Sequence, residues 1–592
     1  MPETPGGALL GLRGGLHPRP LEPDPVRTGV GNGASPVRSR FAPWRGQRVL
    51  GQSPLPHVSR QEAKDLGMHR RTFLTTALAA PLARPALAQS NRARTLRFMP
   101  QAALANLDPI FSPSTIITTH AYCVFDTLYG ANRALQPRPQ MAEGHSVEDD
   151  GRRVTIRLRE GLRWHDGEAV RAADCVASIK RWASRDGFGQ ILMRATAELS
   201  APDDRSIEFR LHRRFPALFD ALAKPGASPC FMMPERIASN PGDRSLGLEH
   251  MIGSGPWRFM ANEYVQGARS HYARNDAYVP RDEPAEAASG GKRVHFDRLE
   301  MIWIPDGGTA AAALRTGEID WIEYPLPDLV PVLERDRNTQ TQIYDPNGFL
   351  GFLRFNHLHP PFNDARVRRA IRDVIVQSDF MSAVALPGDW QECHAMFPCG
   401  LPGVVEFPPA ARGDAAMERA RLALREAGYA GEPIIHINPS DFPAVTQQGR
   451  LTVELMRRLG VNMQPIEADW ASILARRNNR NPPAQGGWHL HNTNGPAATI
   501  ANPAVSFAIR MNGQAAWPGW PMDAAAEAQV EAWIAADDQA AQDVAMRRLQ
   551  EITWESLPFA PTGLFRLRTA FRRDLTGVLQ GPNPFLWNLR RV

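Results

Sequence analysis

A chain of 592 residues is too long for a single compact core, so two or more lobes are expected. Its composition, 43% hydrophobic and 22% charged, is that of an ordinary globular protein. The excess of positive charge lies in the first 88 residues, which hold 12 Lys and Arg against 5 Asp and Glu. The overall charge is +6, so the rest of the chain carries −1, and a protein dedicated to nucleic-acid binding is not expected.

Residues 68–88 read MHRRTFLTTALAAPLARPALA and contain the parts of an export signal. The Arg70-Arg71 pair precedes a short apolar run, and Ala86 and Ala88 form an A-x-A cleavage site. The paired arginines predict a signal peptide of the twin-arginine type, which exports folded proteins. The alternative is an ordinary N-terminal helix with two chance arginines.

The segment before this signal, residues 1–67, is rich in Pro, Gly and Arg and has no sustained apolar period. We expect it to be disordered, or to be a mis-called upstream extension ahead of a true start at Met68. No later stretch approaches the roughly 20 apolar residues that a membrane-spanning helix needs. The chain is therefore expected to be exported and free of the membrane.

Local patterns after the leader predict short strands and helices separated by polar turns. The expected strands cover residues 94–99, 153–159, 257–259 and 299–304, and the expected helices lie around 118–128, 176–182 and 310–315. Gly317 is expected to end the last of these helices. The segment 281–292 is polar and is predicted to be a surface loop.

Beyond residue 346 the pattern changes to alternating strands and helices. Three helices are expected, one capped by Asn363, one capped by Asp414 and ending at Gly428, and one that carries Leu455 and closes at Gly460. Apolar strands are expected at 434–437 and 461–466 between them. This alternation predicts an α/β lobe with a mainly parallel sheet. The last apolar segments, 559–564 and 578 onward, are expected to pair with the first lobe.

Five cysteines are too few for a disulfide framework. Cys393 and Cys399 form the one close pair, and their spacing leaves open whether they are bonded. Cys123, Cys175 and Cys230 are interpreted as small apolar core residues. No CxxC, HExxH or similar ligand spacing occurs, so no metal site and no cofactor are expected.

Four landmarks together resemble the peptide/nickel/opine family of extracellular solute-binding proteins, family 5. They are LREGLRWHDGEAVRAADCVASIKRW (158–182), GSGPWRF (253–259), LRTGEIDWIEYP (314–325) and FNHLHPPFNDARVRRAI (355–371). The resemblance runs through nearly all of the chain after the leader. It implies an α/β, two-lobed clamp of the type II periplasmic-binding-protein kind, with an extra subdomain in lobe one and the ligand closed between the lobes.

On this resemblance, lobe one covers residues 89–345 and 557–592, with the inserted subdomain at roughly 115–235, and lobe two covers 346–556. The protein would be a periplasmic component of an ABC importer in a Gram-negative bacterium. Its partners would be a small peptide-like, opine-like or metal-chelate ligand and the permease and ATPase subunits, and it would act as a monomer. Catalysis is not expected.

The family's peptide-binding members carry an acidic residue three positions after the tryptophan of a Gly-Trp pair, where it holds the peptide's α-amino group. Here Gly487-Trp488 is followed at that position by His491, so ordinary free peptides are not expected as the favoured ligand. The surrounding segment is rich in neutral donors and acceptors, which suit carboxylate, amide or hydroxyl groups.

Candidate ligand-binding residues follow from this segment and from family position. They are Trp488, His489, His491, Asn492, Asn494 and Trp390 in lobe two, and Tyr129 and Ser112 in lobe one. Trp517, Trp520 and Arg354 are weaker candidates, and Arg354 is interpreted as a salt-bridge partner. Two other kinds of function remain as alternatives: an exported hydrolase, for which no GxSxG motif or metal-ligand set is found, and a signalling or chaperone-like protein on the same scaffold.

Overall fold

The computed structural model of the chain describes residues 94–111, 114–240, 244–409 and 412–592, which lie in one compact unit. The predicted leader at 68–88, the segment 1–67 and the candidate residue Ser112 lie outside the described residues. The strands of the described residues form three larger sheets and three two-stranded sheets, and the helices pack against them. None of the described helices has both the length and the apolar character needed to cross a membrane.

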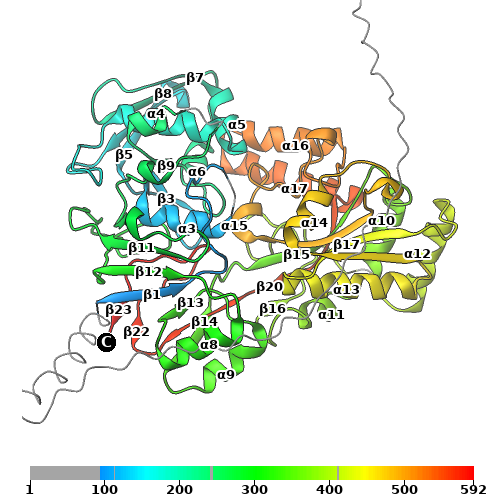
Figure 1. Cartoon of the computed structure of the whole chain (residues 1–592). Helices are drawn as coiled ribbons and strands as arrows, with labels where there is room; N and C mark the ends of the chain where they lie inside the picture. Colours follow the sequence, from blue (N-terminus) through cyan, green and yellow to red (C-terminus); the bar gives the residue numbers. More distant parts are fainter. Residues whose placement is uncertain (1–93, 112–113, 241–243, 410–411) are drawn as a thin grey trace, which may run out of the picture. The chain divides into compact units, whose positions relative to one another are not determined.

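The first sheet has seven strands that come from distant parts of the sequence (Figure 1). In order they are β10 (Trp257–Phe259), β11 (Arg269–Arg274), β12 (Arg298–Ile302), β1 (Thr95–Met99), β13 (Trp321–Ile322), β21 (Arg568–Arg572) and β14 (Thr339–Ile343). β1 runs parallel to both of its neighbours, and the other pairings are antiparallel. The parallel strands β1, β12 and β13 therefore end at the same edge.

The second sheet has six strands and contains most of the expected α/β lobe. In order they are β16 (Trp390–Gln391), β20 (Phe559–Phe565), β15 (Phe349–Phe355), β19 (Leu490–Pro496), β17 (Ile434–Pro439) and β18 (Met463–Ala468). Only β17 with β18 and β17 with β19 are parallel, so the sheet is mixed and the prediction of a mainly parallel sheet is wrong. The reason is that β15 and β20 are antiparallel neighbours in its centre.

A third sheet has four antiparallel strands, which all lie within the stretch where the sequence analysis expected an inserted subdomain. In order they are β5 (Ala142–Glu148), β6 (Arg153–Leu158), β8 (Ser206–Leu211) and β7 (Thr196–Ser200). Helices α4 (Ala172–Ala183), α5 (Gly187–Ala195) and α6 (Leu218–Leu222) pack into the same core. Helix α3 (Thr115–Val124) packs instead with β1 and β12 in the core of the seven-stranded sheet.

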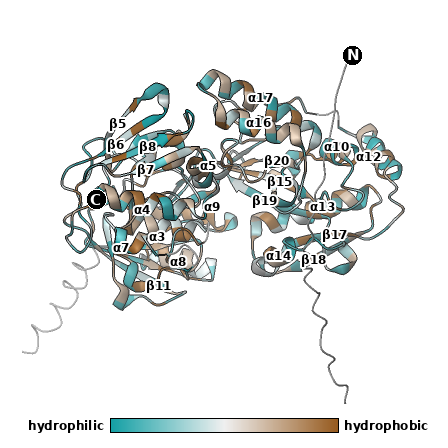
Figure 2. Cartoon of the chain, turned by 90° about the horizontal axis from the view of Figure 1, so that it is seen from above, coloured by the Kyte–Doolittle hydropathy of each residue, from teal (hydrophilic) through white to brown (hydrophobic). Residues whose placement is uncertain are grey.

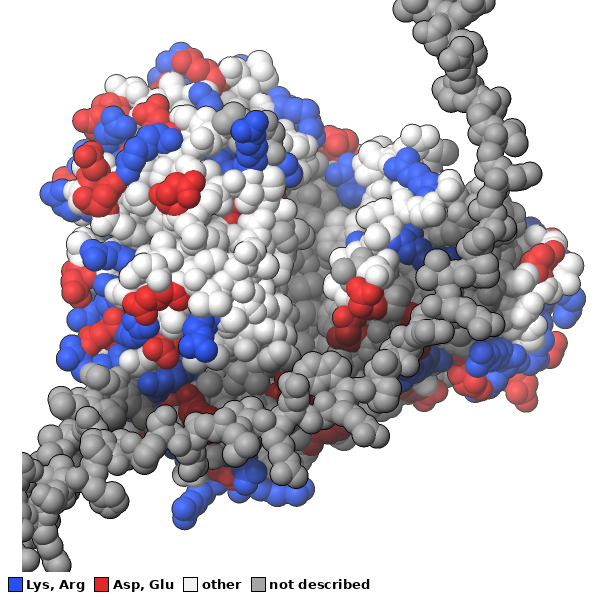
Figure 3. All heavy atoms as spheres, viewed as in Figure 1, with Lys and Arg blue, Asp and Glu red and all other residues white. Residues whose placement is uncertain are grey.

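The remaining helices cover the sheets. Near the first sheet lie α7 (Glu235–Ala238), α8 (Gly307–Thr316) and α9 (Val330–Arg335); with the second are α10 (Ala365–Val374), α11 (Gln377–Ser382), α12 (Asp414–Glu426), α13 (Pro443–Arg458), α14 (Trp470–Arg477), α15 (Ala497–Ile500), α16 (Ala524–Ala535) and α17 (Gln539–Ser556). Hydrophilic residues colour the outward turns of α7 and α12 (Figure 2). On the face drawn in Figure 3, acidic and basic side chains are interspersed.

Several boundaries differ from the sequence-based expectation. The helix expected at 118–128 ends at Val124, because Phe125 is extended and the next residues form a strand with Phe231 and Met232. Asp364, not Asn363, caps α10 with its side chain, and Gly413 is the cap residue before α12, so Asp414 is already helical. Gly317 ends α8 in the left-handed conformation, as predicted.

Two longer-range expectations are wrong. The segment 559–564 was expected to pair with the first sheet, but β20 pairs with β15 and β16 in the second, and the chain returns to the first sheet only with β21. The loop 281–292 was expected on the surface, but residues 287–292 are buried and Lys292 forms a buried ion pair with Asp126 at 2.7 Å. Both errors concern partners that lie more than 150 residues away.

The cysteine pair that the sequence left open is bonded, since Cys393 and Cys399 form a disulfide. Cys123, Cys175 and Cys230 are free and buried, which confirms their interpretation as core residues.

Candidate functional site

Strand β19 carries most of the predicted ligand residues, and the alternation of a strand divides them between two faces of the sheet. Leu490 and Asn492 point toward helix α13, since Leu490 packs in the α10–α13 core and Asn492 contacts β17 on that side. His491 lies on the opposite face, as does Arg354, its register partner on β15. The segment therefore does not form one polar surface.

The face toward α13 holds a buried polar layer, in which His436 Nδ1, Asn438 Oδ1 and Asn492 Nδ2 have no hydrogen-bond partner among the described residues. Asn492 Oδ1 lies 2.9 Å from His436 Nε2, and Asn438 Nδ2 donates to the Thr446 carbonyl at 3.1 Å. All four of these residues are buried, and burial lowers the pKa of His436 to about 4. This layer holds α13 against the sheet, so Asn492 is placed in the interior of the lobe.

On the opposite face, His491 lies among tryptophan side chains. Its ring centroid is 6.3 Å from those of Trp470 and Trp488, and Trp488 packs with Ile435 and Ile437 of β17. Trp488 is fully buried, and its Nε1 donates to the Arg477 carbonyl at 2.9 Å. Trp488 therefore forms the support beneath His491, with its indole N–H already occupied.

The imidazole of His491 is only half satisfied. Nδ1 lies 3.3 Å from the carbonyl of Ile437, which can only accept, so Nδ1 carries the proton of the neutral ring. Nε2 is buried and finds no hydrogen-bond partner among the described residues. Burial, with a smaller contribution from the Arg477 charge, lowers the pKa of His491 well below its usual range. The ring is therefore neutral at physiological pH, and its Nε2 is an acceptor.

Two guanidinium groups lie on the same side as His491 and share one aromatic ring. The Cζ of Arg477 is 4.6 Å from the ring centroid of Trp517, and the Cζ of Arg354 is 4.9 Å from it. Neither guanidinium has a carboxylate partner within the described part of the chain. Burial lowers the pKa of Arg354 to about 9 and that of Arg477 to about 10, and Arg477 contributes to the shift of Arg354.

The two arginines differ in what their donors do. Arg354 is completely buried and donates to four backbone carbonyls, those of Ala508, Trp517, Pro518 and Pro558, at 2.8–3.0 Å. The interpretation of Arg354 as a salt-bridge partner is wrong, because its guanidinium N–H groups donate to backbone carbonyl oxygens and not to a carboxylate. The guanidinium of Arg477 forms no hydrogen bond with described residues, and its side chain is partly exposed at the end of α14.

We call this group the tryptophan-lined site, and it consists of Trp470, Arg477, Trp488, His491 and Trp517. Trp470, Arg477 and Trp517 keep part of their surface exposed, whereas Trp488 and His491 are fully buried. The site thus has a buried floor with one free acceptor and a partly open rim with one free cation. Such a surface can hold an anion beside a neutral hydrogen-bond donor.

The other predicted residues lie elsewhere. His489 Nδ1 accepts from the Ile435 backbone N–H at 2.9 Å, so His489 completes the end of the strand pairing. Asn494 alternates onto the face of Asn492. Trp390 lies on edge strand β16 and packs into the core on the α10–α13 face, away from His491.

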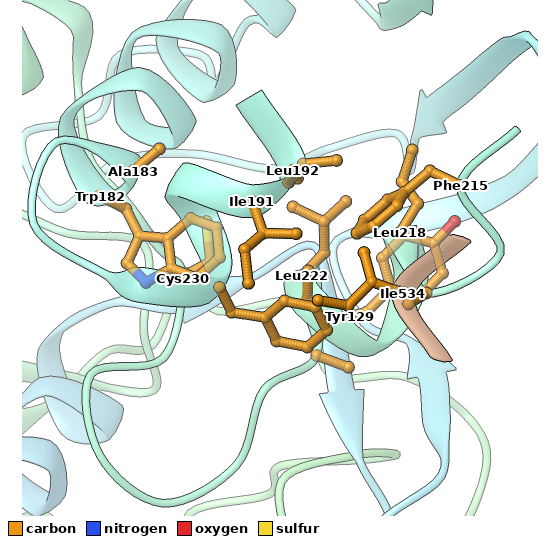
Figure 4. Close-up of a cluster of buried hydrophobic side chains, with 14 of the residues drawn as sticks. Tyr129, Trp182, Ala183, Ile191, Leu192, Phe215, Leu218, Leu222, Cys230 and Ile534 are labelled. Atoms are coloured by element: carbon orange, nitrogen blue, oxygen red, sulfur yellow. The ribbon is translucent and has the colours of Figure 1, made fainter. Parts of the chain in front are cut away.

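Tyr129, predicted as a contact in lobe one, lies in a hydrophobic core. It belongs to the same cluster as Ile191, Leu222 and Ile534 (Figure 4). Its hydroxyl is 2.9 Å from His145 Nδ1, and only 2% of its surface is exposed. Tyr129 is therefore a core residue whose hydroxyl is already paired, and Ser112 lies outside the described residues.

The edge of the first sheet contributes a buried carboxyl that the sequence analysis did not single out. Glu323 follows β13, accepts from the Gln101 backbone N–H at 2.8 Å and lies 3.4 Å from the hydroxyl of Tyr344. Burial raises the pKa of Glu323 to about 7. Parallel strands place their following loops at the same edge, which explains why residues after β1 and β13 meet here.

Comparison with known sequences decides the family. The profile of the bacterial extracellular solute-binding proteins, family 5, middle region, matches residues 136–506. The chain belongs to this family. It is the solute-binding component of an ABC importer.

Curated relatives of this family 5 protein extend over most of its length. A probable peptide ABC transporter periplasmic-binding protein of Sinorhizobium fredii is 34% identical over 540 residues, covering 88% of this chain and 99% of the relative. The glutathione-binding protein GsiB of Pectobacterium atrosepticum is 24% identical over 501 residues, covering 81% of this chain and 91% of the relative. Both relatives are named as binding proteins, and the name of the first assigns it to a peptide ABC transporter.

Solved structures confirm the expected fold, a two-lobed type II periplasmic binding protein. AgaA from A. tumefaciens R10, in complex with agropinic acid, superposes with a TM-score of 0.69 at 19% identity, covering 84% of this chain and 99% of that one. DppA from Helicobacter pylori, in complex with the peptide STSA, gives 0.70 at 19% identity, covering 85% and 99%.

Sequence reasoning missed Trp470 and Arg477 in this family 5 protein. Both lie on α14, whose sequence WASILARR shows no motif, and only the packing of α14 against β17 brings them to His491. Within the described ranges, no three His, Cys, Asp or Glu side chains come together as a metal-ligand set.

Proposed function

We propose that this binding protein closes its two lobes around a peptide-like or amino-acid-derived solute in the periplasm and hands it unchanged to its permease. The observation that carries the proposal is the connection between the two large sheets. Two neighbouring segments cross from one sheet to the other, and they have the form of a hinge. A clamp of this kind needs no catalytic group.

The first crossing leads from β14 through residues 344–348 into β15, and the second leads from β20 through 566–567 into β21. The strands on both sides are paired, β14 with β21 in the first sheet and β15 with β20 in the second. Between them, the Tyr344 N–H donates to the Leu567 carbonyl at 2.9 Å, and Arg566 Nε donates to the Pro346 carbonyl at 2.8 Å. The connection is thus one continuous two-stranded ribbon.

A short ribbon absorbs lobe rotation in a few backbone dihedrals, as hinges of domain closure do. A solute that contacts both lobes only in the closed form shifts the population toward that form. We therefore place the lobe boundaries at the ribbon: among the described residues, lobe one comprises 94–345 and 566–592, and lobe two comprises 346–565. Pairing of β20 within the second sheet supports the boundary at 566 in preference to 557.

The test combines thermal unfolding with small-angle X-ray scattering on the purified protein. Dipeptides, N-blocked peptides, opines, sugar acids and the nickel–histidine complex would be screened at high concentration. A true ligand at about 100 times its Kd stabilises the folded state by about 2.7 kcal/mol. The same ligand should reduce the radius of gyration, and a stabilising ligand that leaves it unchanged would contradict closure.

We also propose that the protein acts in the periplasm, and the sequence of residues 68–88 supports this location. If Arg70 and Arg71 direct export by the twin-arginine route, the double substitution R70K/R71K should leave most of the protein in the cytoplasm. Cell fractionation followed by immunoblotting measures this. Equal amounts of wild type and variant in the periplasm would refute the assigned route.

A further inference from the structure

The tryptophan-lined site combines two features that a ligand-free core does not explain. His491 Nε2 is a buried acceptor with no partner among the described residues, and such an atom costs about 1–3 kcal/mol. Arg477 is a cation that forms no ion pair and no hydrogen bond with described residues, and its guanidinium lies over the face of Trp517. Both groups lie on the same face of the second lobe, and each lacks the complementary half of a polar contact.

The positive charge around His491 disfavours a ligand that carries an ammonium group. Arg354 is the register partner of His491 on β15, and Arg477 lies over the same Trp517 ring as Arg354, so both guanidinium groups place positive charge on the His491 side of the sheet. A ligand ammonium placed against His491 would meet two guanidinium charges and a neutral acceptor, with no carboxylate to stabilise it. The site therefore disfavours a free α-amino group at the position where peptide-binding relatives were expected to hold one.

The same residues suit a ligand that carries a carboxylate and a neutral hydrogen-bond donor. Arg477 presents a planar guanidinium, which matches a carboxylate through two parallel N–H donors. His491 Nε2 presents one acceptor, which matches a neutral amide N–H or hydroxyl. Trp470 and Trp517 are partly exposed at the rim, where they can contact the apolar part of a bound molecule.

We propose that Arg477 binds a carboxylate of the ligand while His491 Nε2 accepts from a neutral N–H or O–H donor on the same molecule. The ligand class is thus an organic acid without a free amine at this position, such as an N-acylated amino acid or peptide, or a hydroxy acid. This inference rests on the proposed solute-binding function and narrows it to one chemical class.

Matched probes test the class. Leu-Leu, N-acetyl-Leu-Leu, N-acetyl-Leu-Leu-amide and gluconate differ in the free amine, the neutral donor and the carboxylate. Thermal shift and isothermal titration calorimetry on the wild-type protein should show binding of N-acetyl-Leu-Leu or gluconate at least about 10-fold tighter than Leu-Leu and the amide. These two probes also distinguish an acylated peptide from a hydroxy acid as the source of the chemistry.

Variants locate the binding. Arg477→Met should weaken the preferred acid by about 10- to 100-fold, because a charge-assisted contact is lost. Arg450→Met is the matched control, since Arg450 is exposed on α13, pairs with Glu467 and lies on the other side of the sheet. Arg450→Met should leave the affinity unchanged. His491→Asp places a carboxylate that can pair with a ligand ammonium, and the variant should discriminate less strongly than the wild type between acetylated and free Leu-Leu.

The outcomes separate the two proposals. If Leu-Leu or the amide binds as tightly as N-acetyl-Leu-Leu and gluconate, or if Arg477→Met and Arg450→Met behave alike, the inference is overturned while solute binding stands. If no probe binds, the ligand class is overturned, and the scattering measurement with the wider panel then decides whether the clamp function also fails.

Discussion

Arg354 and His491 lie directly opposite each other on strands β15 and β19, and their side chains are on the same face of the sheet. Their hydrogen bonding differs. Each of the three guanidinium nitrogens of Arg354 donates to at least one backbone carbonyl, whereas His491 keeps one acceptor free. Arg354 thus fixes the loop that carries Trp517, and that loop in turn contacts Arg477. The position of the candidate site therefore depends on a buried arginine that need not touch the ligand.

Substitution of Arg354 by Met should destabilise the protein by about 3 kcal/mol or more. Four buried carbonyl oxygens would lose their donors, and methionine cannot replace them. Urea denaturation followed by tryptophan fluorescence measures the change in the free energy of unfolding.

The control for this variant is Arg366→Gln, because Arg366 is exposed and pairs with Asp364 at 2.6 Å on the surface. An exposed pair of this kind contributes little to stability because water and salt screen it, so this variant should unfold close to the wild type. Similar losses for the two variants would show that the carbonyl contacts of Arg354 contribute little.

The disulfide between Cys393 and Cys399 should stabilise the second lobe modestly. It closes a short loop, with a sequence separation of 6, and the loss of chain entropy in the unfolded state predicts about 2 kcal/mol. The double variant C393A/C399A should therefore have a lower urea midpoint than the wild type. Reductant should lower the wild-type midpoint by a similar amount and leave the double variant unchanged; a response of the double variant would point to another cause.

Local sequence patterns predicted the fold well where the determinants are local. The helical spacing of Val176, Ile179 and Trp182 predicted α4, and the glycine at 317 predicted the end of α8. The pairing of β20 was mispredicted because its seven buried residues carry no alternation and so no information about which sheet they join. Strand partners more than 200 residues away are decided by tertiary packing.

The candidate site was harder to predict than the fold, because its residues come together only through tertiary packing. The third position after Trp488 identified His491 through a family motif, but nothing in the sequence around Arg477 connects Arg477 with His491. Asn492 was grouped with His491 by proximity in the sequence, although adjacent residues of a strand face opposite sides. Its amide instead contacts His436 in the interior.

Stability should depend on pH through Glu323. Burial raises its pKa from 4.5 to about 7 in the folded protein, so the folded state holds this proton more tightly than the unfolded state. As pH rises from about 4.5 to 7, the unfolded state releases the proton first, and the folded state loses stability relative to it. Glu323→Gln keeps an acceptor for the Gln101 N–H and removes this cost.

The variant should therefore gain on the wild type as pH rises, by an amount that reaches about 3 kcal/mol at most and levels off above pH 7. Urea titrations at pH 5 and pH 8 measure it. Curves for variant and wild type that stay parallel between the two pH values would show that Glu323 is ionised in the folded protein.

Gly449 in the middle of α13 is required by the close approach of this helix to β17. A Cβ at this position would lie 2.0 Å from Asn438 Oδ1 and 2.9 Å from His436 Cε1. Alanine is a better helix former than glycine by about 1 kcal/mol, so propensity alone predicts that Gly449→Ala stabilises the protein. Steric overlap with a buried, hydrogen-bonded layer predicts the reverse, a loss of about 1–3 kcal/mol.

Gly308 in the first turn of α8 provides the matched comparison, because a Cβ there would meet only Asp306 Oδ1 at an ordinary 3.4 Å. Gly308→Ala should leave stability unchanged or raise it by up to about 1 kcal/mol. The opposite signs of the two glycine-to-alanine changes, measured by urea denaturation, test whether packing against His436 and Asn438 outweighs helix propensity. If both variants were stabilised, α13 would have to lie farther from β17 than the structure places it.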